Sequence, residues 1–112
     1  MDKNPFTYLE HIFSAIVRME DYLNGFDFES FSKDNKTIAA TIREFEIIGE
    51  AASNISEDFK NEHSEIPWRK VIGVRNILIH DYMDVDLQIV WNIHKEYLPG
   101  LKKQIKKTLN DK

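Results

Sequence analysis

Apolar residues recur every three or four positions along most of this 112-residue chain, and few helix-breaking residues interrupt them. The sequence contains only four glycines and three prolines. A period near 3.6 residues is typical of amphipathic helices, whereas strict alternation indicates strands. The pattern therefore predicts an all-α fold. The length is typical of one domain, so residues 1–112 are expected to form a single domain.

Four segments carry this helical pattern. The first is expected to run from Pro5 to Asn24, since Asn4 is a suitable N-cap and Gly25 a suitable stop. Mostly short links between four amphipathic helices favour an antiparallel four-helix bundle. Pro99-Gly100 interrupts the last segment and is expected to kink or split that helix. The other three predicted starts are a position after Asp34, Pro67-Trp68, and a position after Asp84 or Asp86.

Two connectors differ in character. The first, Phe26 to Lys33, contains three phenylalanines, and it leaves room for a short extra turn of helix. We expect its rings, Phe26, Phe28 and Phe31, to pack against the bundle end rather than to stack on bases. The second, Ser56 to Pro67, is polar and charged, and is predicted to be a surface loop with room for one loose turn. Trp68 and Trp91 are expected to be core anchors.

Gly49 lies within the apolar stripe of the second helical segment. Glycine inside a helix costs about 1 kcal/mol relative to alanine. The usual compensation is the close approach of another backbone, and Ala52 and Ser53 nearby are also small. We therefore expect this helix to be the most crowded of the four.

Arg75 interrupts the apolar stripe of the third segment, which is formed by Trp68, Val71, Ile72, Leu78 and Ile79. An unpaired buried guanidinium is very costly, so Arg75 must be paired or face a cleft. One interpretation is a structural ion pair with Glu46 or Glu50. The other is an anion-binding arginine in a groove, because the planar guanidinium matches a phosphate.

His80 follows Arg75 after four residues, Tyr82 lies two positions further on, and Asn76 and His80 form an i, i+4 pair. Histidine near a helix end is favoured by the helix dipole, which is a purely structural explanation for it. Histidine is also the side chain that titrates near neutral pH. An arginine and a histidine at one groove could cleave a phosphodiester, although this spacing alone is weakly specific.

Composition excludes several classes of protein. The chain has no cysteine, which excludes disulfides and thiol chemistry, and it has no apolar run long enough to span a membrane. Met1 is followed by a polar stretch rather than a signal peptide, so we expect a soluble, cytoplasmic protein. The net charge of −4 excludes a broad basic surface but not a local basic site. The lysine-rich end, Lys102, Lys103, Lys106, Lys107 and Lys112, is interpreted as a solvated helix end, with contact to RNA phosphates as the alternative.

No metal or cofactor is expected. The four histidines, His11, His63, His80 and His94, lack the spacing of a zinc site. Asp81, Asp84 and Asp86 lack the glycine and terminal glutamate of an EF-hand, so helix capping explains them better than calcium binding.

The stretch Arg75-Asn76-Ile77-Leu78-Ile79-His80-Asp81-Tyr82 resembles the Arg-x4-His-x-Tyr motif of the HepT toxins, a branch of the HEPN superfamily of small helical proteins. Further segments match in the expected order over roughly residues 5 to 101. These are Tyr8-Leu9-Glu10-His11-Ile12, Ile42-Arg43 with Glu46-Ile47-Ile48-Gly49-Glu50-Ala51-Ala52, Ile66-Pro67-Trp68, and Val85-Asp86-Leu87-Gln88-Ile89-Val90-Trp91.

The resemblance implies a four-helix bundle that forms a homodimer, with two copies of the motif at a shared cleft. It implies a metal-independent endoribonuclease that acts as a toxin, with an MNT-type nucleotidyltransferase as antitoxin. By motif position, Arg75 and His80 would be catalytic, Asn76 would support them, and Tyr82 would receive AMP from the antitoxin. The alternative is a non-catalytic helical dimer that binds a nucleotidyltransferase, or RNA, without cleavage.

Overall fold

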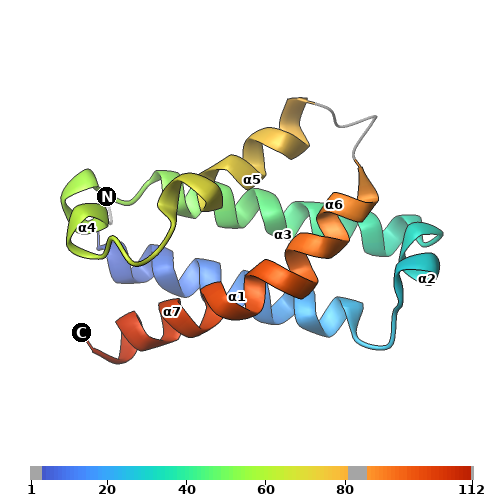
Figure 1. Ribbon diagram of the computed structural model, residues 1–112, viewed down its shortest axis with the longest axis horizontal. Coiled ribbons are helices and arrows are strands. Elements are labelled where there is room, and N and C mark those ends of the chain that lie inside the picture. Colours follow the sequence, from blue (N-terminus) through green and yellow to red (C-terminus); the bar gives the residue numbers. More distant parts are fainter. Residues whose placement is uncertain (1–3, 81–85, 112) are drawn as a thin grey trace.

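The computed structural model describes residues 4–80 and 86–111, with the side chains of residues 76–80 excepted. Every regular element in this part of the chain is helical, which confirms the predicted fold class. Four long helical stretches run in alternating directions (Figure 1). They are α1 (Pro5–Leu23), α3 (Asn35–Ser53), α5 (Trp68–His80), and the continuous run of α6 (Leu87–Asn92), η2 (Ile93–Tyr97) and α7 (Leu98–Asn110). Two short helices, α2 (Phe28–Ser32) and α4 (Glu57–Glu62), lie in the connectors.

The helix starts are set by the caps that the sequence indicates. Asn4 accepts a hydrogen bond from the backbone N–H of Phe6 at 2.9 Å, and Asp34 accepts one from Thr37 at 3.0 Å. Asp86 caps α6, whereas Asp84 lies outside the described residues. Such caps satisfy backbone donors that have no partner within the helix. After α1, Gly25 adopts a φ of +87°, a conformation that strongly favours glycine.

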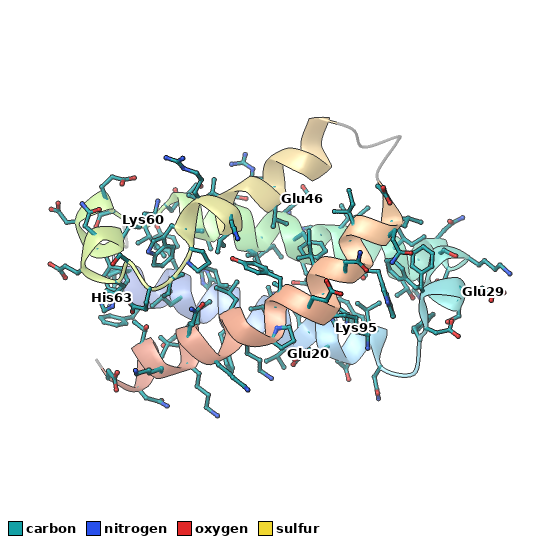
Figure 2. All side chains as sticks on the ribbon, viewed as in Figure 1. Glu20, Glu29, Glu46, Lys60, His63 and Lys95 are labelled. Atoms are coloured by element: carbon teal, nitrogen blue, oxygen red, sulfur yellow. The ribbon has the colours of Figure 1, made fainter. Side chains whose placement is uncertain are left out.

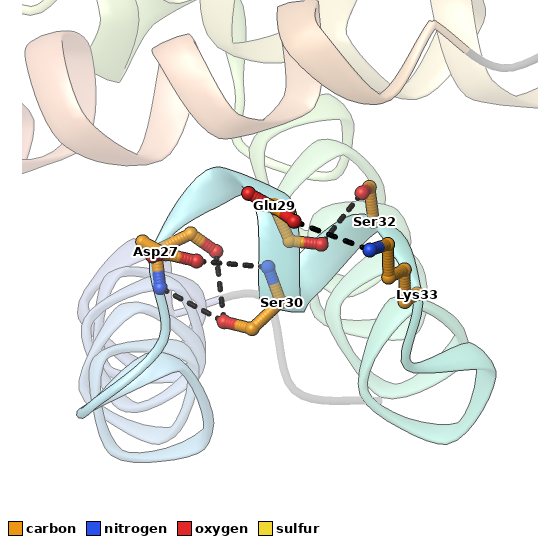
Figure 3. A network of polar contacts seen from close by, with 5 residues as sticks. All are labelled: Asp27, Glu29, Ser30, Ser32 and Lys33. Atoms are coloured by element: carbon orange, nitrogen blue, oxygen red, sulfur yellow. Dashed lines mark hydrogen bonds and ion pairs between the residues drawn. The ribbon is translucent and has the colours of Figure 1, made fainter.

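The short helix α2 forms where the sequence leaves room for an extra turn. A capping box closes its start: Ser30 N–H donates to the Asp27 carboxylate at 2.8 Å, and Asp27 N–H donates to the Ser30 hydroxyl at 3.0 Å (Figure 3). Phe31 is fully buried, and its ring lies 5.3 Å from that of Trp91. The prediction that these aromatic rings pack against the bundle is confirmed.

The segment from Ser56 to Pro67 is more ordered than the sequence indicates. The predicted surface loop is wrong for residues 57–62, which form α4 with Ser56 as its N-cap. The physical reason is Phe59, which is buried with its ring 4.2 Å from His63 and 5.6 Å from Phe6. The burial of one aromatic side chain thus holds a mostly polar helix against the bundle. The polar composition of the segment gave no indication of this helix.

The core lies where α3 packs against both α1 and α5. The buried apolar side chains of α1 and α3 include Leu9, Ile12, Ile16, Met19, Phe45 and Ile48. Trp68 and Trp91 are buried, as expected for core anchors. None of the described helices combines the length and the apolar character that a membrane crossing requires.

The predicted irregularity near Pro99 takes the form of a π-helical turn. Residues Ile93–Tyr97 form η2, and the N–H of Leu98 bonds back five residues to the carbonyl of Ile93. Proline has no N–H, and its ring clashes with the carbonyl four residues earlier, so a regular α-helix cannot pass this point unchanged. The last helical stretch therefore widens for one turn and continues as α7.

Candidate active site

Arg75 lies within α5, on the side of that helix that meets α3. It is half-buried, and Val71 and Val74 beside it are buried. The guanidinium therefore belongs to a residue at the edge of the core. Arg75 thus lies beside the apolar stripe of α5.

Gly49 of α3 is the residue against which Arg75 packs. A Cβ atom placed on Gly49 would collide with the Cβ of Arg75, and would lie 3.3 Å from its Cγ and 3.4 Å from its Cα. The prediction that Gly49 marks a close helix–helix approach is confirmed. The approach brings α3 directly onto the side-chain stem of Arg75.

The structural ion pair considered for Arg75 is not found. Among the side chains that the structure describes, no ion pair joins Arg75 to Glu46 or Glu50. Glu46 is half-buried on α3 (Figure 2), and Glu50 is exposed. Neither of the two carboxylates considered as partners therefore pairs with Arg75.

The other motif residues lie at or beyond the limit of the described part. The backbones of Asn76 and His80 belong to α5, but their side chains are not among those described. Tyr82 lies outside the described residues, as do Asp81 and Asp84. The α5 backbone thus continues as a helix from Arg75 to His80. The roles of Asn76, His80 and Tyr82 stay predictions.

An apolar groove runs beside α5, between it and the α6–η2 stretch. Two adjoining cavities of about 280 Å³ each share Ile93 and Tyr97 as lining residues. The α5 side is formed by Lys70, Gly73 and Val74. At its far end the groove reaches Ile89, whose side chain is 42% exposed. Arg75 does not line this groove, although its neighbour Val74 does.

An ion pair that the sequence analysis missed joins an exposed arginine of α1 to a buried glutamate of α3. The Nε and Nη2 atoms of Arg18 donate to the Glu44 carboxylate at 3.1 and 2.8 Å, and the Tyr22 hydroxyl donates to it at 3.0 Å. These hydrogen bonds to Glu44 raise the pKa of Arg18 and of Tyr22. Glu44 interrupts an apolar stripe just as Arg75 does, which is the signal that could have revealed it.

His94 is a second buried polar group that the sequence did not single out. It lies in η2, and its Nδ1 atom has no hydrogen-bond partner among the described residues. Burial lowers the pKa of His94, and the nearby charge of Lys95 lowers it further (Figure 2). Burial likewise raises the pKa of Tyr97, whose hydroxyl is also unpartnered within the described part. His94 is thus a buried residue of η2, whereas Tyr97 is half-buried and lines the groove beside α5.

The lysine-rich end is partly engaged in the fold. Lys102 pairs with Glu20 at 2.9 Å, with its ammonium group 5.9 Å from the centre of the Phe13 ring. Lys103, Lys106 and Lys107 are exposed on α7. Within the described residues, no group of three or more acidic or histidine side chains could hold a metal ion.

Comparison with known protein families matches a ribonuclease HepT-like family model to residues 12–108. The chain belongs to the HepT-like family. The HepT-like match contains the whole of α3 and α5, and so both Gly49 and the motif from Arg75 to Tyr82.

Among proteins with curated names, this HepT-like chain is 47% identical to the "Probable ribonuclease HepT" of Thermococcus cleftensis, over 89% of this chain and 91% of that one. It is 39% identical to "Putative RNase TTE0752" of Caldanaerobacter subterraneus subsp. tengcongensis, over 96% of each chain. No solved structure gives a significant match.

Proposed function

We propose that this chain is a metal-independent endoribonuclease and the toxin of a toxin–antitoxin pair. The observation that carries the proposal is Arg75. It is half-buried beside the apolar stripe of α5, it packs on a glycine, and no ion pair joins it to Glu46 or Glu50. Membership of the HepT-like family supports RNA as the substrate. A cation held in this way is suited to a phosphodiester, because its planar guanidinium can bind two phosphate oxygens together.

The proposed reaction is the attack of an RNA 2′-hydroxyl on the adjacent phosphorus. The bond from phosphorus to the 5′-oxygen breaks, which leaves a 2′,3′-cyclic phosphate and a 5′-hydroxyl. One proton leaves the attacking hydroxyl and one is delivered to the departing oxygen, and His80 is assigned one of these transfers. Arg75 stabilises the charge that develops on the phosphate oxygens, and Asn76 supports it.

A homodimer completes the proposed site, so that two histidines share the two proton transfers. The groove between α5 and η2 supports this arrangement, because its apolar lining lies beside the helix that carries the motif. A second chain seated there would cover Val74 and Ile93 and bring two copies of α5 together.

The proposed partner is an MNT-type nucleotidyltransferase antitoxin. In this scheme the Tyr82 hydroxyl attacks the α-phosphorus of a nucleoside triphosphate, AMP is transferred to Tyr82, and pyrophosphate leaves. The added phosphate would compete with RNA for Arg75 and so silence the enzyme. The intact mass of the chain co-expressed with its partner should rise by one or more AMP groups. An unchanged mass, or full silencing of a Tyr82→Phe variant, would contradict this part of the proposal.

RNA digestion in EDTA tests the nuclease itself, with the chain purified in the absence of any partner. Wild type should cut, whereas Arg75→Ala should lose about 10²–10³ in rate and His80→Ala about 10²–10⁴. Arg69→Ala, which removes an exposed arginine from the same helix, is the matched control and should cut like wild type. Equal cutting by all four proteins would indicate a contaminant. A wild type that binds RNA or a nucleotidyltransferase but cuts nothing would favour the non-catalytic alternative.

A further inference from the structure

Gly49 differs from the other helical glycines of the described chain in what surrounds it. A Cβ atom on Gly73 of α5 or on Gly100 of α7 would meet no atom within 4 Å. The three atoms nearest to a Cβ atom on Gly49 would all belong to Arg75, and the nearest of them would collide with it. The absence of a side chain at position 49 therefore permits the close contact with the arginine of the motif.

The contact involves the part of Arg75 that cannot move aside. The three atoms nearest to the ideal Cβ of Gly49 are the Cβ, Cγ and Cα of Arg75, not the far end of its side chain. Real Cβ atoms essentially never lie under 3.0 Å from such neighbours, so a methyl group at position 49 would displace the α5 backbone. Closely packed interiors transmit such displacements rather than absorb them.

We propose that Gly49 is a positioning residue for catalysis: it allows α5 to lie against α3 at the distance that places Arg75 for the phosphate. The inference rests on the proposed nuclease function. The buried neighbours Phe45, Ile48 and Ala52 hold the α3 side of the contact rigid. Since a misplacement of about 1 Å in a catalytic group can cost about 10²-fold in rate, a single methyl group is enough to matter.

If Gly49 only stabilised the fold, Gly49→Ala would also lower activity. The test must therefore separate a displacement of Arg75 from a loss of folding stability. We would measure single-turnover cleavage at saturating RNA, RNA binding, thermal unfolding, and the Nε–Hε resonance of Arg75 by NMR. Gly100→Ala is the matched control, since it adds the same methyl group to an exposed helical position with open space around it.

Gly49→Ala should lower the single-turnover rate about 10–100-fold at temperatures where the variant is fully folded, with RNA binding changed less than threefold and the Arg75 resonance shifted. Gly100→Ala should match wild type in rate. The double variant Gly49→Ala/Gly100→Ala should regain thermal stability, because alanine favours a helix over glycine. Its single-turnover cleavage rate should nevertheless stay as low as that of Gly49→Ala. A double variant that recovers both stability and rate would show that Gly49 acts only through folding.

The failure of this inference is distinguishable from the failure of the nuclease proposal. An active wild type with an equally active Gly49→Ala variant would overturn the role of Gly49 alone. A wild type that does not cut RNA would overturn both.

Discussion

Arg18 and Arg75 both reach α3 from a neighbouring helix, and their surroundings there differ. Arg18 meets the Glu44 carboxylate, whose side chain is only 6% exposed. Arg75 meets the bare backbone of Gly49. The first arginine pairs with a buried carboxylate, whereas no ion pair involves the second among the described side chains. At these two points of α3, a carboxylate pairs with one arginine, and a glycine backbone packs against the stem of the other.

Arg18→Met should destabilise the fold by about 1–2 kcal/mol, because Glu44 would lose hydrogen bonds to a charged donor; the partial exposure of Arg18 keeps the cost at this lower end. Glu44→Gln removes the same charge pair from the other side. Urea unfolding of both single variants and the double variant gives a double-mutant cycle. In it, Glu44→Gln should lower the free energy of unfolding less in the Arg18→Met background than in wild type. Additive losses would mean that the pair contributes no coupling, and RNA cleavage by folded Arg18→Met should equal that of wild type.

At the scale of elements, the last helical stretch differs most from a regular helix. Pro99 forces the π-helical turn of η2, and that turn carries His94 into the core with its Nδ1 unpartnered among the described residues. A buried neutral histidine is a source of pH sensitivity, because the unfolded chain can accept a proton that the folded chain resists.

The sign of this pH effect follows from the lowered pKa of His94. Its contribution to stability is complete above the ordinary histidine value of 6.5 and is lost as the pH falls toward the lower pKa of the folded state. Between pH 7 and 5, the free energy of unfolding of wild type should therefore fall more steeply than that of His94→Gln. Urea unfolding at several pH values measures both slopes, and parallel slopes would show that His94 does not contribute.

At the scale of the whole molecule, two large apolar side chains are exposed among the described residues. Ile89 is 42% exposed at the end of the groove beside α5, and Val17 is 41% exposed on α1. The two positions are alike in exposure but differ in location. They offer a direct test of which face of the bundle meets a second copy.

The proposed dimer should give a sedimentation mass of about twice the 13.2 kDa of one chain. Ile89→Glu should shift the protein toward monomers and lower RNA cleavage with it, because a charge would be desolvated at the interface. Val17→Glu changes α1, which contributes no residue to the groove lining, and should leave both the mass and the activity unchanged. If Val17→Glu dissociates the dimer and Ile89→Glu does not, the assigned face is wrong.

The sequence by itself determined the four long helical stretches of this protein, because caps and helical periodicity act within a turn or two of the chain. It placed Asn4, Asp34 and Asp86 as caps, and identified Gly49 and Arg75 as anomalies. Only the tertiary structure decided what those anomalies meet. It paired Glu44 with Arg18, seated Arg75 on Gly49, and ordered α4 through Phe59. These outcomes depend on side chains brought together from distant parts of the sequence, and local patterns carry no information on such distances.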